Sequence, residues 1–296
     1  MAITINTNLS SMIVQKNLQK STTSLNNAIE RMTTGYKINH AADNAAGYSI
    51  ARNWEAQISS LDIAADNAAT GADMLSTLED NYALISSHVQ RVRDLTEQAA
   101  NGTYGDQSKK AIESEITARL DEIDRIAKNC EFNGIKLMAG KVTNGDAGDV
   151  GLDIQVGIDS NSGKSRIHLA KDLFAKGEVL GLFTTETDAA AFASKCAGRV
   201  TGSGNTAQEQ LTKIDDVISK ISERITTLGA AQNRIESAIE SIGVQSENIT
   251  SSLSTLRDAD VATESSNYIK AQILQQASAT LLATANQSPS IALNLL

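Results

Sequence analysis

The chain contains a single proline in 296 residues, Pro289, close to the C-terminal end. Proline breaks helix interiors because it lacks an N–H and its ring clashes with the preceding turn. Its absence before position 289 therefore permits long helices without requiring them. Aromatic residues are also scarce, at 3%, and Trp54 is the one tryptophan, but the apolar fraction of 41% allows a substantial core.

Cysteine and histidine are too few and too scattered to predict a disulfide framework or a metal site. Cys130 and Cys196 lie far apart in sequence and match no zinc pattern. We expect two free, partly buried thiols, with a Cys130–Cys196 disulfide as the alternative. The histidines His40, His88 and His168 stand apart from one another, and none lies in H-E-x-x-H. We expect no metal ligands and no cofactor.

The charge pattern argues against nucleic acids and membranes as partners. The net charge is −9, and Lys109-Lys110 is the densest basic pair, whereas nucleic-acid binding needs cationic patches. No stretch approaches the 18 apolar residues of a membrane span. The first residues, MAITINTNLSSMIVQK, lack the charged start and apolar stretch of a Sec signal peptide. These features alone predict a cytosolic protein, unless it leaves the cell without a cleaved signal.

Motifs of enzyme chemistry are absent or imperfect, so we expect no catalytic residues. The segment GIDSNSGKS, residues 157–165, resembles a phosphate-binding loop, but it has five residues rather than four before the Gly-Lys pair. It also falls between two predicted strands, which favours a hairpin turn. The chain has no G-x-S-x-G or G-x-G-x-x-G motif. Glu113, Glu115, Asp121, Glu122 and Asp124 lie on one amphipathic segment, which is typical of a solvated helix face.

The strongest pattern is a ladder of apolar residues at spacings of three and four, interrupted at Gln232 and Ser246. This period of 3.5 predicts a helix roughly 70 Å long with one narrow apolar seam. Its expected partner is an antiparallel helix over residues 44–100, where Ala65, Ala68 and Ala72 would allow close approach. The ladder consists of Leu211, Ile214, Ile218, Ile221, Ile225, Leu228, Ile235, Ile239, Ile242, Ile249, Leu253 and Leu256.

Helical periods also occur at both ends of the chain. Residues 8–34 place Leu18, Leu25, Ile29 and Met32 at helical spacing, and residues 260–286 stack Ile269, Ile273, Ala277 and Leu281 at steps of four. A further helix is predicted over about 106–129, after a stop at Asn101-Gly102. Its apolar face consists of Ile112, Ile116, Leu120, Ile123 and Ala127. The tail residues Ile291, Leu293, Leu295 and Leu296 are apolar and need a partner to cover them.

The middle of the chain changes character after Asn133-Gly134. Leu152, Ile154, Val156 and Ile158 alternate with polar residues, which predicts a strand and, with Ile167 and Leu169, a β-hairpin over 150–170. We expect its turn at 159–163, a short helix at 187–197 and a loop at 202–205. The predicted fold is mainly α: an elongated antiparallel bundle or coiled coil of long helices with a small β-hairpin element and paired terminal helices.

Several long motifs resemble those of bacterial flagellins, in the same order. They are INTNL at 5–9, ERMTTGYKINHAADNAAGYSIA at 30–51, VQRVRDLTEQAANGT at 89–103, EIDRIAKNCEFNGIKLM at 122–138, and the ending LRDADVATESSNYIKAQILQQASATLLATANQSPSIALNLL at 256–296. The likeness covers about residues 1–140 and 208–296.

The resemblance implies a structural subunit of the flagellar filament that functions in motility. Residues 1–42 and 256–296 would form an inner domain of paired helical arms. Residues 43–255 would form a helical rod with a small β and loop insertion at 139–205 and no large outer domain. The self-assembly seams would contain Leu18, Leu25, Ile29, Met32, Ile269, Ile273 and Leu281. We further hypothesise that Gln232 and Ser246, together with the helix-weakening Gly229 and Gly243, leave slack for subunits to slide between filament states.

The resemblance also implies a set of partners and an extracellular location. The subunit would leave the cell unfolded through the flagellar type III export channel, keep its N-terminus, and bind an export chaperone through its C-terminal arm. In the filament it would contact itself and the hook-associated and cap proteins. Monomers would present Gln90, Arg91, Leu95 and Glu115 to Toll-like receptor 5, although the same residues could instead serve protofilament packing.

Two other functions compete with a filament subunit. A hook–filament junction protein has the same terminal architecture, but the C-terminal likeness to flagellins argues against it. A flagellin-like enzyme with a catalytic insert is the rival of a different class. The short middle segment and the missing H-E-x-x-H argue against the enzyme.

Overall fold

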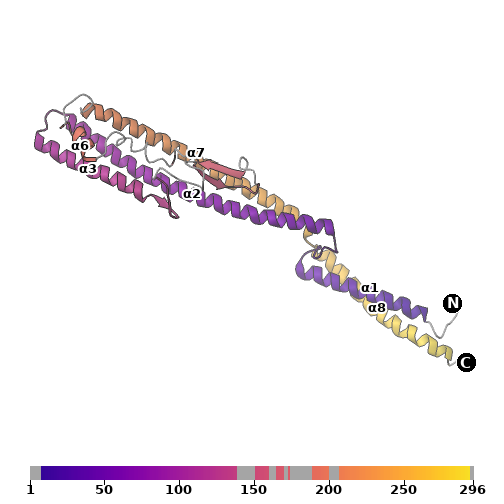
Figure 1. Cartoon of the computed structure of the whole chain (residues 1–296). Coiled ribbons are helices and arrows are strands. Elements are labelled where there is room, and N and C mark those ends of the chain that lie inside the picture. The colour runs from indigo at the N-terminus through magenta and orange to yellow at the C-terminus, as the bar shows by residue number, and fades with distance from the viewer. Residues whose placement is uncertain are drawn as a thin grey trace. The chain divides into compact units, whose positions relative to one another are not determined.

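The structure is a computed structural model that describes residues 8–138, 151–159, 165–169, 173, 189–199 and 207–293. The chain divides into two compact units: Met1–Ile58 with Glu247–Leu296, and Ser59–Ser246. Within the described ranges, no helix combines the length and apolar character that a membrane span requires. Figure 1 shows that each unit consists mainly of long helices.

The long helices predicted from periodicity are present. They are α1 (Leu9–Thr34), α2 (Ala45–Ala100), α3 (Asp106–Asn129), α6 (Ala189–Cys196), α7 (Ala207–Arg257) and α8 (Val261–Leu293). The strands are β1 (Glu131–Phe132), β2 (Ile135–Lys136), β3 (Leu152–Gln155) and β4 (Arg166–Leu169). The mainly α class with a small β element is confirmed.

The second unit is built on the antiparallel pair of α2 and α7, as the apolar ladder predicted. Arg93 on α2 donates to Asp215 on α7 at 2.6 Å, and Gln232 on α7 donates to Glu79 on α2 at 2.8 Å. The residue number rises along one helix as it falls along the other, so the two helices run in opposite directions. Gln232, which interrupts the apolar ladder, is thus a polar contact across the pair.

The buried face of α7 is broader than the predicted seam. It also includes positions next to the ladder residues that the ladder did not contain. Ile214, Ile221, Leu228 and Ile235 are fully buried, as expected. Between them, however, the buried positions are Val217, Arg224 and Ala231, whereas the predicted Ile218 and Ile225 are only half-buried. Gln232, where the ladder is interrupted, is also half-buried. A narrow two-helix seam is the wrong geometry here, because a helix that covers a multi-element core buries a wider stripe.

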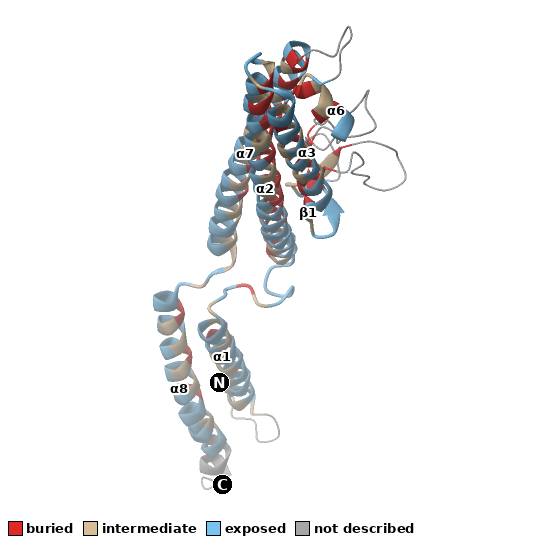
Figure 2. Ribbon diagram, turned by 90° about the vertical axis from the view of Figure 1, so that its left-hand side faces the viewer, coloured by how far each residue is buried: buried red, intermediate tan, exposed pale blue. Residues whose placement is uncertain are grey.

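The helix α3 and the β-elements complete this core. The apolar face predicted for α3 is buried at Ile112, Ile116, Leu120, Ile123 and Ala127. The pair β1–β2 is joined by Asn133 and Gly134, whose φ angles of 49° and 78° suit a tight hairpin turn. Figure 2 shows the buried residues concentrated where α2, α3 and α7 face one another.

The hairpin β3–β4 is confirmed as an antiparallel pair, with Leu152 opposite Leu169. The predicted strand is too long, since β3 ends at Gln155 and Ile158 is exposed. Pairing ends where Val156 donates to the carbonyl of Ser165 at 2.8 Å, just before Gly157. Most of the predicted turn at 159–163 and the whole predicted loop at 202–205 lie outside the described residues. The short helix predicted at 187–197 is α6.

Two further differences concern the ends of helices and the alanines of α2. The helix α8 continues to Leu293, beyond the predicted end at 286, and the side chains of the apolar tail lie outside the described part. Of the three alanines expected to admit α7, Ala68 is fully buried, while Ala65 and Ala72 are half-buried. Close approach in this region instead involves Gly71, against which the side chain of Ile154 packs.

Both cysteines are free and buried, which confirms the prediction of two thiols without a disulfide. Burial raises the pKa of the Cys130 thiol to about 11 and that of Cys196 to about 12. Reactivity requires the thiolate, so both groups are inert in the folded unit. The glycines Gly229 and Gly243 have nothing within 4 Å of where a Cβ would stand, so packing does not explain them. Their role as slack stays a prediction.

The contact between Gly71 and Ile154 predicts a coupled effect on stability. Gly71→Ala improves helix propensity by about 1 kcal/mol, but the new Cβ would lie 2.5 Å from Cδ1 of Ile154 and 3.2 Å from its Cγ2. Because of overpacking, we expect the free energy of unfolding of the monomer, measured in urea, to fall by about 1 kcal/mol net. Ile154→Val removes Cδ1, so the double variant should cost less than the sum of the singles by about 1 kcal/mol.

Gly229→Ala is the matched control, because its Cβ would enter open space. It should stabilise the monomer by about 0.5–1 kcal/mol. Additive effects of Gly71→Ala and Ile154→Val, or a gain from Gly71→Ala as large as that from Gly229→Ala, would contradict the close packing of β3 on α2.

Candidate assembly surface

The helices α1 and α8 are bounded by polar caps that the sequence supplies locally. The side-chain oxygen of Asn8 accepts from the backbone N–H of Ser11 at 3.1 Å, and Gly35 ends α1 with a φ of 76°. Before α8, the Asp260 carboxylate accepts from the Thr263 hydroxyl and the Ala262 N–H. The hydrogen bond from Thr263, followed by those from the backbone, lowers the pKa of Asp260. Both helices therefore begin at defined positions.

The interface between α1 and α8 buries small and polar side chains. Ala28 of α1 and Ala271, Ser278 and Glu264 of α8 are at most 9% exposed. An alanine methyl contributes far less apolar burial than a leucine or isoleucine, which stabilise by about 1.5–3 kcal/mol each when fully buried. The two helices are thus paired along their length with little hydrophobic stabilisation from the contact itself.

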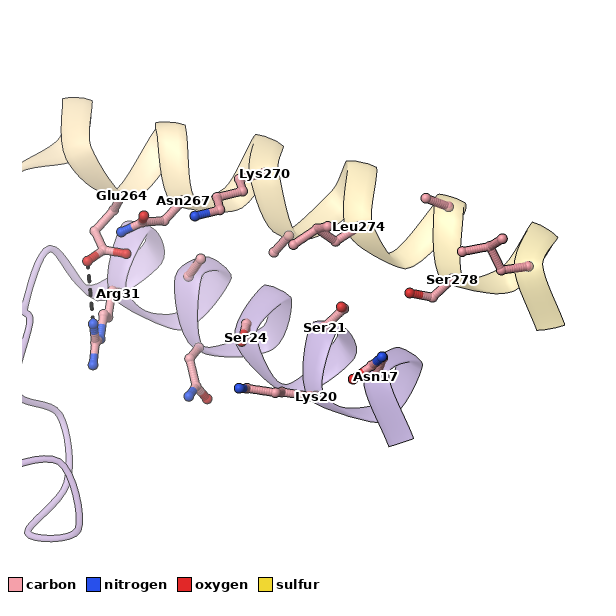
Figure 3. Close-up of a pocket in the computed structure, with 15 residues that line it drawn as sticks. Asn17, Lys20, Ser21, Ser24, Arg31, Glu264, Asn267, Lys270, Leu274 and Ser278 are labelled. Atoms are coloured by element: carbon pink, nitrogen blue, oxygen red, sulfur yellow. Dashed lines mark hydrogen bonds and ion pairs between the residues drawn. The ribbon is translucent and has the colours of Figure 1, made fainter. Parts of the chain in front are cut away.

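Polar contacts cross the same interface and leave space between the helices. Arg31 forms an ion pair with Glu264 at 3.4 Å, drawn in Figure 3, and Gln275 donates to the Thr22 hydroxyl at 3.1 Å. A groove of about 680 Å³ lies between the helices and has small or polar residues along most of its walls. The two helices therefore lie close together through small residues and leave an open groove along their contact.

Large apolar side chains of the two helices remain exposed instead. Of the predicted seam residues, Leu18 and Leu25 are half-buried, while the other five range from 37% exposed at Met32 to 59% at Ile273. Figure 2 shows both helices as mostly exposed. Contiguous exposed apolar surface marks a site of interaction. The exposed members are Ile29, Met32, Ile269, Ile273 and Leu281.

Sequence reasoning missed part of this exposed set. The additional exposed residues do not fit the helical spacing that defined the predicted seam. Their hydrophobicity was the one sequence feature that could have indicated them. They are Leu9, Met12 and Ile13 of α1 and Val261 and Leu274 of α8. We call the exposed large apolar residues of both helices together the arm surface.

The segment that links α1 to α2 and the segment that links α7 to α8 contact each other within the first unit. Tyr36 and Asp258 pair as an antiparallel bridge, and Lys37 donates to the Arg257 carbonyl at 2.7 Å. The Arg257 guanidinium lies 4.0 Å from the centroid of the Tyr36 ring and forms an ion pair with Glu55. The segments before α2 and after α7 are therefore bonded to each other.

The four residues expected to contact a receptor or another subunit are only partly on the surface. Arg91 of α2 donates to Glu115 of α3 through Nε at 3.0 Å, and its Nη2 lies 2.9 Å from the same carboxylate oxygen. Both residues are accessible, and Gln90 is exposed. Leu95 is 2% exposed and packs in the core, so its expected place on the surface is wrong. It stands three residues after the buried Val92 and four before the buried Ala99, which places it on the buried face of α2.

Within the described ranges, no group of three or more His, Cys, Asp and Glu residues is placed to hold a metal ion. His40 lies beside Glu30 at 2.8 Å and His168 beside Asp153 at 2.7 Å, each on a different part of the chain. Both histidines are exposed, and each pairs with a carboxylate close to it in the fold.

The two ends of the chain match known family models. Residues 5–143 match the bacterial flagellin N-terminal helical region, and residues 211–296 match the bacterial flagellin C-terminal helical region. The chain belongs to the bacterial flagellin family. It is 35% identical over 320 residues to flagellin of Xenorhabdus nematophila, covering 100% of both chains, and 34% identical over 305 residues to flagellin of Bacillus subtilis, covering 99% of both.

A third relative and two solved structures are also similar to this chain. The flagellar filament 30.7 kDa core protein of Treponema maltophilum is 31% identical over 294 residues, which cover 99% of each chain. The crystal structure of Bacillus cereus flagellin is 27% identical, with a TM-score of 0.45, over 60% of this chain and 88% of that one. A putative flagellar hook-associated protein from Vibrio parahaemolyticus is 16% identical, with a TM-score of 0.57, over 73% of this chain and 100% of that one. That last likeness concerns the fold alone.

Family membership decides the general function. Flagellins are structural proteins that polymerise into the flagellar filament outside the bacterial cell, and this chain is such a filament subunit. Because the chain covers relatives of similar length from end to end, it carries no large outer domain beyond theirs. The resemblance seen in the terminal motifs is confirmed.

Proposed function

We propose that this flagellin polymerises through the arm surface, which neighbouring subunits cover in the filament. The observation that carries the proposal is that the α1–α8 pair buries mainly small residues, while large apolar residues of both helices stay exposed. Contacts that build a filament must be heterologous and must not close into a ring. On this view the arms correspond to residues 1–42 and 256–296, and residues 43–255 form the rod.

The energetics of the α1–α8 pair favour ordering on assembly. Fixing one residue of backbone costs about 1–2 kcal/mol in conformational entropy, and isolated helices are marginal in water. The alanines Ala28 and Ala271 contribute little apolar burial against that cost. The arms are therefore poorly ordered in the monomer and become ordered when neighbouring subunits bury the arm surface.

Export and capping follow from the same surface. The chain leaves the cell unfolded through the flagellar type III export channel, and an export chaperone covers the apolar residues of α8 until assembly. Hook-associated and cap proteins bind the same arm surface at the two ends of the filament. The exposed Ile269 and Ile273 support these roles, because each partner would remove them from water.

Monomers also present the exposed Gln90, Arg91 and Glu115 to Toll-like receptor 5. The Arg91–Glu115 pair joins α2 to α3 at the surface, so it offers a rigid charged feature to a partner. Leu95 supports this surface from the core and does not touch the partner. The same residues can pack between protofilaments, which would hide them in the filament and expose them in the monomer.

Amide hydrogen exchange compares the order of the arms in the two states. We expect fast exchange over residues 5–35 and 260–290 in the monomer and strong protection of both ranges in the filament. Residues of the second unit, such as those of α3, serve as the internal control because they should be protected in both. Strong protection of the arms in the monomer would contradict ordering on assembly.

Substitution on the arm surface tests the role of its apolar residues. Ile273→Gln keeps a side chain of similar length but loses the stabilisation of about 1.5–3 kcal/mol that a buried isoleucine gives the filament. The critical concentration for seeded polymerisation should therefore rise about 10-fold or more. Thr280→Gln, at an exposed polar position of α8, should change it little. Equal effects of the two variants would exclude a buried Ile273. Extension of seeds by the wild type also separates a flagellin from a junction protein.

Receptor recognition is tested with monomers. Arg91→Ala should weaken binding to Toll-like receptor 5 by about 1.4 kcal/mol, because it removes a cation and its ion pair with Glu115. Roughly 10-fold more monomer should then be needed for the same signal. Arg125→Ala is the matched control, since Arg125 also forms an exposed ion pair, with Glu122 on the same α3. Unchanged signalling by Arg91→Ala, or an equal loss with Arg125→Ala, would contradict the assignment.

A further inference from the structure

The helix α8 contains the only proline of the chain, and this leaves one of its carbonyl groups without a helical donor. In an α-helix the N–H of each residue donates to the carbonyl four residues earlier. Pro289 has no N–H, so the carbonyl of Ala285 receives no such bond from within the helix. The helix nevertheless continues to Leu293. The Ala285 carbonyl is therefore open to a donor from outside the helix.

That donor comes from the other end of the chain. The side-chain amide of Asn8 donates through Nδ2 to the Ala285 carbonyl at 2.7 Å, across 277 positions of sequence. The same amide accepts from the Ser11 N–H through Oδ1 at 3.1 Å, which caps α1. Only a side chain with a donor and an acceptor, as in Asn or Gln, can do both at once. About one turn further along α1, the Ser11 hydroxyl donates to Oδ1 of Asn286 at 2.7 Å.

We propose that these contacts fix the axial register of α1 against α8. We call Asn8, Ser11, Ala285 and Asn286 the terminal clasp, with Pro289 as the residue that creates its acceptor. Elsewhere the interface buries Ala28, Ala271 and Ser278, and small side chains fit a neighbouring helix at several axial positions. The ion pair of Arg31 with Glu264 and the hydrogen bond from Gln275 to Thr22 use long side chains, which tolerate more axial displacement than the short Asn8. A specific polar contact at a helix interface selects one register among such alternatives. The clasp provides that selection, because the Ala285 carbonyl is the one left open by Pro289.

The clasp bears on assembly, and this inference rests on the proposed function of the arm surface. A shift of α1 along α8 would change which exposed apolar residues of the two helices stand side by side. Neighbouring subunits can cover the arm surface only if every subunit presents the same arrangement. The clasp requires both ends of the chain in place, so a subunit acquires the correct register when its two termini meet.

A double-mutant cycle in seeded polymerisation tests the clasp. Asn8→Asp keeps the acceptor that caps α1 but replaces the donor with a carboxylate oxygen facing the Ala285 carbonyl. It should raise the critical concentration about 10-fold, as expected for a lost hydrogen bond to an otherwise unsatisfied group. Pro289→Ala restores an N–H that can donate to the Ala285 carbonyl. In that background, Asn8→Asp should raise the critical concentration by less than about 3-fold.

Asn17→Asp is the matched control, the same chemical change further along α1 in the wall of the groove. It should alter the critical concentration less than about 2-fold and equally in both backgrounds. An Asn8→Asp effect that is absent, or that is equally large in the wild-type and Pro289→Ala backgrounds, would overturn the clasp. Failure of the wild type to extend seeds would instead overturn the proposed function, so the two failures are distinguishable.

Discussion

The structure depends on where the chain can bury its large apolar side chains. In the second unit, Leu228 and Ile235 of α7 are fully buried in one core with apolar residues of α2 and α3. In the first unit, α1 and α8 place Ala28 and Ala271 at their contact and leave Ile269 and Ile273 exposed. One unit therefore completes its core within a single chain, whereas the helical pair of the other requires cover from outside. On the proposed function, polymerisation supplies that cover.

Polar groups complement this division by specifying how the helices meet. Gln232 interrupts the apolar ladder of α7, yet it bonds to Glu79 across the antiparallel pair. Inside the same core, the Tyr82 hydroxyl donates to the Leu173 carbonyl at 2.7 Å, and burial raises the pKa of Tyr82. In the arms, where apolar burial is weak, the Asn8 amide takes over this role. Such directional contacts discriminate between arrangements that hydrophobic burial alone would leave nearly equivalent.

The sequence predicted which segments are helical better than it predicted what their faces touch. The start of α3 after Asn101-Gly102 and its buried face followed from local signals and periodicity. Periodicity shows that an apolar face exists, but not which neighbours cover it. For this reason the buried position between Ile221 and Leu228 was misplaced, with Arg224 buried and Ile225 half-buried. The bond from Asn8 to Ala285 could not be predicted at all, because no local pattern relates residues at opposite ends of the chain.

Electron cryomicroscopy of native filaments tests the central claim most directly, because it resolves the side chains of the arms in their assembled environment. The account predicts that Ile269, Ile273 and Leu281, all more than half exposed in the single chain, are buried against neighbouring subunits. A filament in which these side chains remain exposed to water, with the subunits joined elsewhere, would contradict it.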